Sequence, residues 1–278
     1  MSLSAEKTVD ISSPQPNLHD RLTEPPIVGE WAKRFYREYV GITDEEELKK
    51  HLMEVRGLAW QVYSYYCVAS FSFINSSLGE SFGREFYDGV LQRLKRGDML
   101  LDLACAFGYT ARNLVYDGAP QENIISGDLR KGFWDLGYQL FRDQDKFHGE
   151  FREGDIFDPE YLKDLEGKID IIHTTNFFHL FKLPEQKNLV RRLTELVSTK
   201  PGTIIFGHQV GDTEVYYSQS RLNPGTGLYR HTEESFRAMF KDNATGNWDI
   251  NIWYTPRTWK VTETFRIRGK LTFVITRL

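Results

Sequence analysis

Three acidic residues stand at or near the ends of short apolar segments, a pattern typical of a nucleoside-binding site. These residues are Asp102, Asp128 and Asp155. In α/β sheets, ligands bind beyond the carboxyl ends of the strands, and an acid there can accept hydrogen bonds from both hydroxyls of a ribose. Asp155 could take the amino group of an adenine, with Ile156 against the ring. We therefore expect a nucleoside site, with Asp128 on the ribose.

The turn after the first of these acids is built from small residues. Ala104, Ala106 and Gly108 occupy alternate positions, which allows a ligand to approach the backbone closely. The glycine order Gly-x-Gly-x-x-Gly of nicotinamide-dinucleotide enzymes is missing, and a carboxylate at Asp102 would repel a pyrophosphate. The same carboxylate suits an ammonium group, such as that of S-adenosylmethionine. The alternative, that the alanines only pack a helix against a strand, leaves the three acids unexplained.

Four histidines are candidates for a role beside the acceptor: His173, His179, His208 and His231. Two interpretations of His179 stay open, because it follows an apolar segment near the expected methyl group but also stands among phenylalanines. It either orients an acceptor oxygen or packs at the start of a helix. His208 could also face the pocket, whereas His231 before Thr232 favours a helix N-terminus. No group of His, Cys and Asp residues has the spacing of metal ligands, so we expect no metal.

Alternating apolar segments and helical patterns would position these residues. We expect strands at 99–103, 124–128, 151–156, 169–175 and 203–207, and helices at 109–117 and 183–198. This order indicates an α/β fold with a parallel sheet and helices on both faces. The segments 248–254 and 270–276 alternate apolar with polar residues, as an antiparallel pair at the sheet edge would.

The region before the first strand divides into two parts. Residues 1–26 lack periodicity and predict a flexible arm, whereas residues 27–96 show helical spacing of aromatic residues. A capping box at 43–46 predicts a helix that Thr43 caps. Leading helices can cover the mouth of such a sheet as a lid, in which case Tyr36 and Tyr63 would line an apolar chamber. The alternative is that most of the aromatic residues in 27–96 form a core of the helices themselves and do not line a chamber.

Composition limits the class of protein. The formal net charge is −4, without the basic excess that nucleic-acid binding needs, so we expect no nucleic-acid partner. The chain has 2 cysteines, which is too few for a disulfide framework. No apolar run approaches the roughly 18 residues of a membrane span, and the N-terminus does not have the order of a secretory signal. We therefore expect a cytoplasmic protein.

The order of these motifs resembles the class I S-adenosylmethionine-dependent methyltransferases. The segment 102–108, Asp-Leu-Ala-Cys-Ala-Phe-Gly, resembles the family motif Asp-x-Gly-x-Gly-x-Gly, and Lys200-Pro201-Gly202 resembles its turn before the fifth strand. Alanine replaces two family glycines, which is tolerable where φ is negative. The resemblance implies a seven-stranded, mostly parallel Rossmann-like sheet over 97–278 with an antiparallel C-terminal hairpin. It implies that S-adenosyl-L-methionine is held by Asp102, Ala104, Phe107, Gly108, Asp128, Leu129, Asp155, Ile156, Thr175 and Asn176.

Within this superfamily the chain resembles the fungal meroterpenoid methyltransferases in length, in its helical N-terminal part and in the segment 176–181. That group implies methylation of the carboxylate of a farnesylated orsellinic-type intermediate to a methyl ester. The small-molecule carboxylic acid would bind beside Tyr36, Tyr63, Phe178 and His208, with His179 orienting it. Two alternatives remain: a phenol or enol acceptor, and a non-catalytic protein that keeps only the cofactor fold. A homodimer also stays open.

Overall fold

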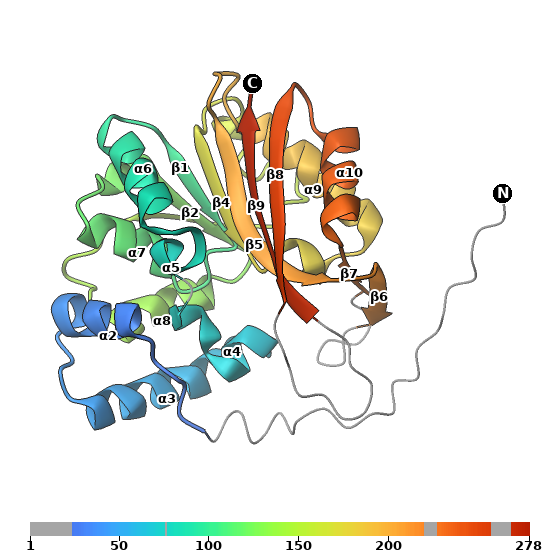
Figure 1. Ribbon diagram of the computed structural model, residues 1–278. Helices are drawn as coiled ribbons and strands as arrows, with labels where there is room; N and C mark the ends of the chain where they lie inside the picture. Colours follow the sequence, from blue (N-terminus) through green and yellow to red (C-terminus); the bar gives the residue numbers. More distant parts are fainter. Residues whose placement is uncertain (1–23, 76, 220–226, 257–267) are drawn as a thin grey trace.

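The computed structural model describes residues 24–75, 77–219, 227–256 and 268–278. A seven-stranded sheet with the order β3-β2-β1-β4-β5-β9-β8 forms its centre (Figure 1). Strands β1 to β5 are parallel, and β9 runs antiparallel to both β5 and β8. The strands are β1 Leu100–Leu103, β2 Ile124–Asp128, β3 Glu150–Glu153, β4 Ile171–Thr175, β5 Ile204–Asp212, β8 Trp248–Pro256 and β9 Arg268–Arg277, with a separate pair of β6 Tyr216–Gln219 and β7 Gly227–Arg230.

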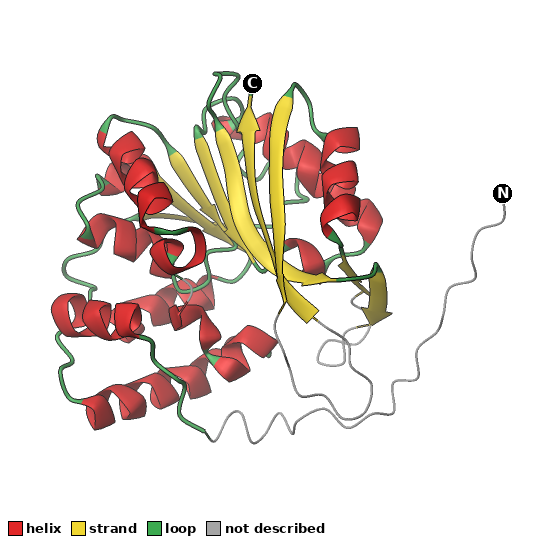
Figure 2. Cartoon of the chain, in the orientation of Figure 1, coloured by secondary structure: helices red, strands yellow, loops and turns green. Residues whose placement is uncertain are grey.

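Helices lie on both faces of this sheet (Figure 2). The α-helices of the core are α5 Leu78–Phe82, α6 Arg84–Lys95, α7 Tyr109–Tyr116, α8 Lys131–Phe141, α9 Leu183–Leu196 and α10 Glu233–Asn243. Before them come α2 Glu30–Phe35, η1 Tyr36–Val40, α3 Glu45–Val62, α4 Tyr66–Ser70 and η2 Ser72–Asn75. The short turns of helix within the core are η3 Gln121–Asn123, η4 Lys163–Leu165 and η5 Phe178–Leu180.

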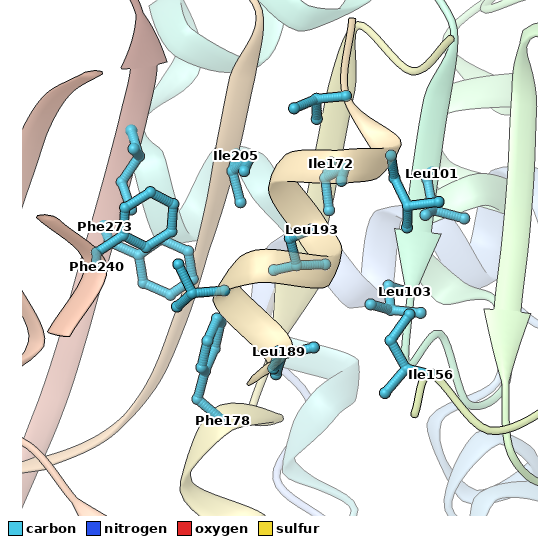
Figure 3. Packing of buried hydrophobic residues seen from close by; sticks show 14 of the residues in the cluster. Leu101, Leu103, Ile156, Ile172, Phe178, Leu189, Leu193, Ile205, Phe240 and Phe273 are labelled. Carbon is cyan, nitrogen blue, oxygen red and sulfur yellow. The ribbon is translucent and has the colours of Figure 1, made fainter. Parts of the chain in front are cut away.

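Alternation along the strands divides the core into two layers. Leu101 and Leu103 of β1 face α9 and α10, where they join Leu189, Leu193 and other buried residues (Figure 3). Leu100 faces the opposite layer, which α5, α6, α7 and α8 cover. Both faces of β1, β2, β4 and β5 are therefore buried, which explains why the segments of β1, β2 and β4 appear in the sequence as apolar runs. The edge strand β3 is only partly buried.

The helices α2, α3 and α4 lie at the end of the sheet where the parallel strands terminate (Figure 1). They share one apolar cluster with the core, in which Phe35 and Tyr36 pack with Phe107, Tyr109 and Phe141. Phe35 and Tyr109 meet edge to face, with ring centroids 5.6 Å apart. The N-terminal helices therefore cover the turn after β1 directly.

The predicted fold class is confirmed, with three local corrections. The strand predicted at 151–156 is β3 Glu150–Glu153, so Asp155 and Ile156 lie beyond its end. Asp44, rather than Thr43, caps α3, because its side chain accepts a hydrogen bond from the backbone N–H of Glu47. The fifth strand continues past the predicted residue 207 to Asp212, because β9 pairs with it along its whole length. Residues 1–23 of the predicted arm lie outside the described residues. Among the described helices, none has the length and apolarity needed to cross a membrane.

Candidate cofactor and acceptor site

The turn between β1 and α7 holds three residues in the left-handed region of backbone space. The φ values are 58° for Ala104, 46° for Ala106 and 66° for Gly108. The condition under which alanine replaces glycine without strain, a negative φ, is therefore not met. A left-handed alanine costs about 1–2 kcal/mol, and such strain is typical of functional sites.

Hydrogen bonds that this turn donates to the neighbouring strand β2 stabilise it. The backbone N–H of Ala106 donates to Asp128 Oδ2 at 2.9 Å, and that of Cys105 donates to the carbonyl of Gly127 at 3.2 Å. On the other side, α8 approaches so closely that a Cβ at Gly137 would lie 2.4 Å from the carbonyl oxygen of Phe107. Only glycine fits at that contact, so α8 fixes the outer wall of the turn.

A buried ion pair supports the same wall. Arg112 Nε donates to Asp143 Oδ2 at 2.7 Å, and neither side chain is exposed. Arg112 Nη1 also donates to the carbonyl of Phe107 at 2.7 Å. Tyr39 of η1 donates to the same Asp143 carboxylate at 2.8 Å. The strained turn is therefore connected to both α7 and the N-terminal helices by charge-assisted hydrogen bonds.

Asp128 lies at the carboxyl end of β2, beside this turn. Its second oxygen, Oδ1, accepts a hydrogen bond from the backbone N–H of Arg130 at 2.9 Å. A carboxylate offers about four acceptor positions, so about two remain for a ligand. Burial raises the pKa of Asp128 above its ordinary value, although the two backbone N–H groups oppose this shift. Leu129 beside it is 51% exposed and available for contact with a planar ring.

Asp102 is buried behind the turn and pairs with a histidine of the neighbouring strand. His173 Nδ1 lies 2.7 Å from Asp102 Oδ1, and both side chains are 3% exposed. Asp102 Oδ2 and His173 Nε2 are buried without a hydrogen-bond partner among the described residues. A buried carboxylate oxygen without a partner is costly unless a cation or donor meets it.

The third acid, Asp155, lies just beyond β3 and is exposed, whereas Ile156 is 5% exposed. The backbone N–H of Gly154 donates to the Asp128 carbonyl at 3.1 Å, so the two strand ends lie side by side. Asp155 Oδ1 accepts from the backbone N–H of Phe157 at 3.0 Å. The predicted ribose and adenine positions are therefore adjacent.

The end of β4 supplies the opposite side of the site. Thr175 pairs with His208 in the β4–β5 register, and Asn176 adopts a left-handed φ of 52°. The backbone N–H of Asn176 donates to the His208 carbonyl at 2.7 Å. His208 is 5% exposed and lies on the same face of β5 as Phe206. These residues therefore lie together where β4 ends, at the same edge of the parallel sheet as the end of β2.

His179 lies in η5, immediately after this segment. Burial lowers its pKa to about 3, and the charge of Arg230 acts in the same direction. His179 Nδ1 is buried without a hydrogen-bond partner among the described residues. The imidazole is therefore neutral at physiological pH, able to orient a ligand oxygen but poorly suited to act as a base.

The expected aromatic residues separate into different environments. Tyr36 is fully buried in the N-terminal cluster, and Phe178 is fully buried between α9 and α10, where its ring meets Phe236 and Phe273. Phe107 stacks on Phe73 at a centroid distance of 4.8 Å. Tyr63 lies under Arg130, whose guanidinium carbon is 3.7 Å from the ring centroid. Tyr63 therefore reaches the strand end that carries Asp128.

Sequence reasoning missed Arg112, Arg130 and the role of His173. Arg130 follows Asp128 by two positions, and that closeness to a predicted ligand residue was an available signal. Arg112 and His173 depend on partners far away in the sequence, Asp143 and Asp102, so no local signal marks them. Among the described residues, no group of three or more His, Cys, Asp or Glu side chains is arranged to hold a metal ion.

The arrangement suits a nucleoside that carries an ammonium group. Asp128 offers acceptors for a ribose diol, Ile156 an apolar surface for a base, and Asp102 an unpartnered carboxylate oxygen for a cation. The residues thus fit S-adenosyl-L-methionine on their own chemistry.

Comparisons with known proteins identify methyltransferases as relatives. The sequence model of the meroterpenoid methyltransferase N-terminal domain matches residues 16–74. The O-methyltransferase phiE of a fungal species is 36% identical over 74% of this chain and 70% of that protein. The Asnovolin E/Chermesin D methyltransferase nvfJ of Aspergillus novofumigatus is 32% identical over 76% of this chain and 73% of that protein. A solved S-adenosylmethionine-dependent methyltransferase of Methanosarcina mazei is 14% identical, with a TM-score of 0.49 over 69% of this chain and 98% of that chain. The chain belongs to the family of fungal methyltransferases that includes phiE and nvfJ.

Proposed function

We propose that this methyltransferase transfers a methyl group from S-adenosyl-L-methionine to the carboxylate of a meroterpenoid acid, a farnesylated orsellinic-type intermediate, and forms a methyl ester. The observation that carries the choice of a carboxylate is the state of His179. Its pKa of about 3 makes it a weak base at neutral pH, and Arg230 is the cation that acts on it. An acceptor that is already ionised needs no base, and a neighbouring cation favours an anionic acceptor.

The proposal assigns the cofactor to the edge formed by β1, β2, β3 and β4. Asp128 accepts the ribose hydroxyls, Asp155 and Ile156 contact the adenine, and Asp102 faces the ammonium group. The left-handed turn lets the backbone approach the cofactor closely. The remaining contacts are assigned to Ala104, Phe107, Gly108, Leu129, Thr175 and Asn176.

When bound, S-adenosyl-L-methionine supplies an electrophilic methyl group on a sulfonium that is a good leaving group. The chain then has to align and desolvate the attacking oxygen. A carboxyl group has a pKa of about 4 and is ionised near neutrality, whereas a phenol of pKa about 10 would benefit from a base. His179 and His208 orient the oxygen in this scheme, and no side chain has to remove a proton.

The N-terminal helices act as a lid in the proposal. They lie at the strand ends, and the stacking of Arg130 on Tyr63 brings the end of α3 beside Asp128. Tyr36 and Phe178 are buried, so their role is to shape the walls rather than to touch the acceptor in this conformation. The match of residues 16–74 to a meroterpenoid methyltransferase domain supports an acceptor of that class.

The free thiols of Cys67 and Cys105 support a cytoplasmic location within this proposal, since such thiols persist in reducing compartments. Imaging of a fluorescent fusion tests the location. Light scattering after size-exclusion chromatography distinguishes a monomer from a homodimer.

The test is incubation of the purified protein with the cofactor and a farnesylated orsellinic-type acid, followed by mass spectrometry. We expect a gain of one methyl group that mild alkaline hydrolysis removes, because esters hydrolyse and aryl ethers do not. The matched control is the same compound with its carboxyl group blocked as an amide. Methylation that survives alkali, or that persists on the blocked compound, would assign the reaction to a phenol or enol oxygen instead.

A further inference from the structure

We propose that His173 is a positioning residue: its Nδ1–H holds the Asp102 carboxylate so that the free oxygen, Oδ2, presents its charge to the ammonium group of the cofactor. The inference rests on the proposed cofactor site and extends it to a residue that touches no ligand. The distance of 2.7 Å between Nδ1 and Oδ1 and the burial of both side chains are its starting point.

The register of the sheet places this pair on one face. Asp102 of β1 lies directly opposite His173 of β4 and Ser126 of β2, and His173 lies opposite Phe206 of β5. Side chains in register on neighbouring strands point to the same face. Among the described residues, the side chain that hydrogen-bonds to the Asp102 carboxylate on this face is His173, while the Ser126 hydroxyl is buried without a partner.

The distance to the strand end is short. Asp102 is two residues before Ala104, the first left-handed residue of the turn, which corresponds to roughly 7 Å along a strand. A carboxylate that rotated away from the turn would face apolar side chains instead, because Leu100 on the same face belongs to the buried layer under α6 and α7. The hydrogen bond to His173 fixes one oxygen sideways and leaves the other for the cofactor.

Packing fixes the imidazole itself. The ring of His173 lies against Phe206, with centroids 5.1 Å apart, and Phe206 in turn meets Phe82 and Phe86 edge to face at 5.2 and 5.0 Å. A ring held in this way keeps its Nδ1 aimed at Asp102. Residues of α5 and α6 therefore contribute indirectly to the orientation of a carboxylate on β1.

Two substitutions separate the hydrogen bond from the packing. His173→Phe keeps a ring against Phe206 but removes the donor, whereas His173→Asn loses the ring but keeps an amide N–H at the same number of bonds from Cβ as Nδ1. Two ligands separate the amino-acid end of the cofactor, which carries the ammonium group, from its nucleoside. S-adenosylhomocysteine carries it, and 5′-methylthioadenosine has the nucleoside and sulfur without it.

Calorimetric titration of the full chain tests the proposal. We expect His173→Phe to weaken S-adenosylhomocysteine binding by about tenfold or more, since hydrogen bonds to charged groups are among the stronger ones, and to leave 5′-methylthioadenosine binding unchanged. His173→Asn should restore most of the lost affinity. In an Asp102→Asn background, His173→Phe should have no further effect on S-adenosylhomocysteine, because a positioning residue acts only through the group it positions.

The contrary outcomes are distinct. Equal weakening of both ligands by His173→Phe, or an undiminished effect in the Asp102→Asn background, would make His173 a structural residue and overturn the inference. If His173→Phe does not fold, His173→Asn alone tests the inference. A loss of affinity for S-adenosylhomocysteine but not for 5′-methylthioadenosine in His173→Asn would then overturn it. Absence of S-adenosylhomocysteine binding by the unmodified protein would instead overturn the proposed cofactor site, which is a different result.

Discussion

The backbone N–H of Ala106 donates to the carboxylate of Asp128 at 2.9 Å, which joins the strained turn after β1 to the end of β2. One side chain thus serves two purposes in the proposed site. It stabilises a left-handed alanine and keeps acceptor positions for a ribose. Loss of Asp128 should therefore affect both ligand affinity and the turn.

We predict that Asp128→Ala weakens S-adenosylhomocysteine binding at least tenfold, because charge-assisted hydrogen bonds contribute about 1.5–3 kcal/mol each. Asp128→Asn should bind S-adenosylhomocysteine more weakly than the unmodified protein but more tightly than Asp128→Ala, since the asparagine carbonyl can accept one of the hydrogen bonds. Isothermal titration calorimetry measures both. The control is the exposed acid Asp145, whose replacement by alanine should change nothing. An unchanged dissociation constant for Asp128→Ala would remove this residue from the site.

The left-handed alanines give a prediction about stability. Ala104→Gly and Ala106→Gly should each stabilise the fold by about 1 kcal/mol, because glycine adopts a positive φ without the steric cost of a Cβ. Urea denaturation monitored by circular dichroism measures the change. Ala111→Gly in α7 is the matched control and should destabilise by about 1 kcal/mol or more, since that residue is helical and buried. Loss of stability in both turn variants would show that these alanines do not carry the strain.

Breaking the buried ion pair between Arg112 and Asp143 should lower the stability of the protein strongly. Asp143→Ala should destabilise the protein by about 3–5 kcal/mol, because it leaves a buried guanidinium without its counter-charge. Thermal denaturation measures the change, and Asp88→Ala, which removes an exposed partner of Arg84, should leave the melting temperature nearly unchanged. A small effect of Asp143→Ala would mean that water reaches Arg112.

The burial of His231 should make the stability of the folded protein depend on pH. Burial lowers its pKa to about 4, and its Nε2–H donates to Gln186 Oε1 at 3.0 Å. The unfolded chain binds a proton below about pH 6.5, whereas the folded protein does not until about pH 4, so stability is lost as the pH falls through this window. The contribution of His231 is about 3 kcal/mol over the whole window. The stability of the unmodified protein relative to His231→Gln should be constant above about pH 6.5 and fall as the pH drops from 6.5 to 4; a difference that stays constant through this window would contradict the assignment.

The neutral state of His179 gives a prediction about activity. With a pKa of about 3, His179 does not titrate near neutrality, so the rate should be flat above about pH 6 if the acceptor is a carboxylate. His179→Asn should retain a measurable fraction of the rate, because it can still form hydrogen bonds. His179→Ala should lose about a hundredfold, since an acceptor displaced by an ångström reacts more slowly by that order. Equal inactivity of both variants, with a wild-type rate that rises steeply through pH 7, would require a base and a phenol or enol acceptor.

Local patterns were enough to predict the elements that build the cofactor edge. The strand 124–128 was predicted with its observed bounds, because its apolar run ends at a single acid. The strand β5 was predicted too short, because its continuation holds buried polar side chains such as His208 and Gln209, whose burial depends on β9. The helix α8 and the β6–β7 pair were not predicted, and the short strands of that pair offer no alternating apolar pattern.

The side-chain pairs of the site lay beyond sequence reasoning for a different reason. Asp102 and His173 meet through the register of β1 with β4, and that register depends on the whole sheet rather than on either segment. The ambiguity between Thr43 and Asp44 is of a simpler kind, because each has a glutamate three residues later. The backbone conformation of Ala104 is likewise invisible in the residue type, since alanine favours the opposite sign of φ.

The Tyr39–Asp143 hydrogen bond has a consequence for engineering acceptor specificity by exchange of parts between relatives. A chimera that takes residues 24–75 from another family member would place foreign aromatic residues against Phe107, Tyr109 and Phe141, and a foreign partner against Asp143. Such a graft should succeed only when the loop after α8 travels with it. The boundaries of the exchanged segments should therefore be chosen so that the whole aromatic cluster is exchanged together, and not at the single sequence position before β1.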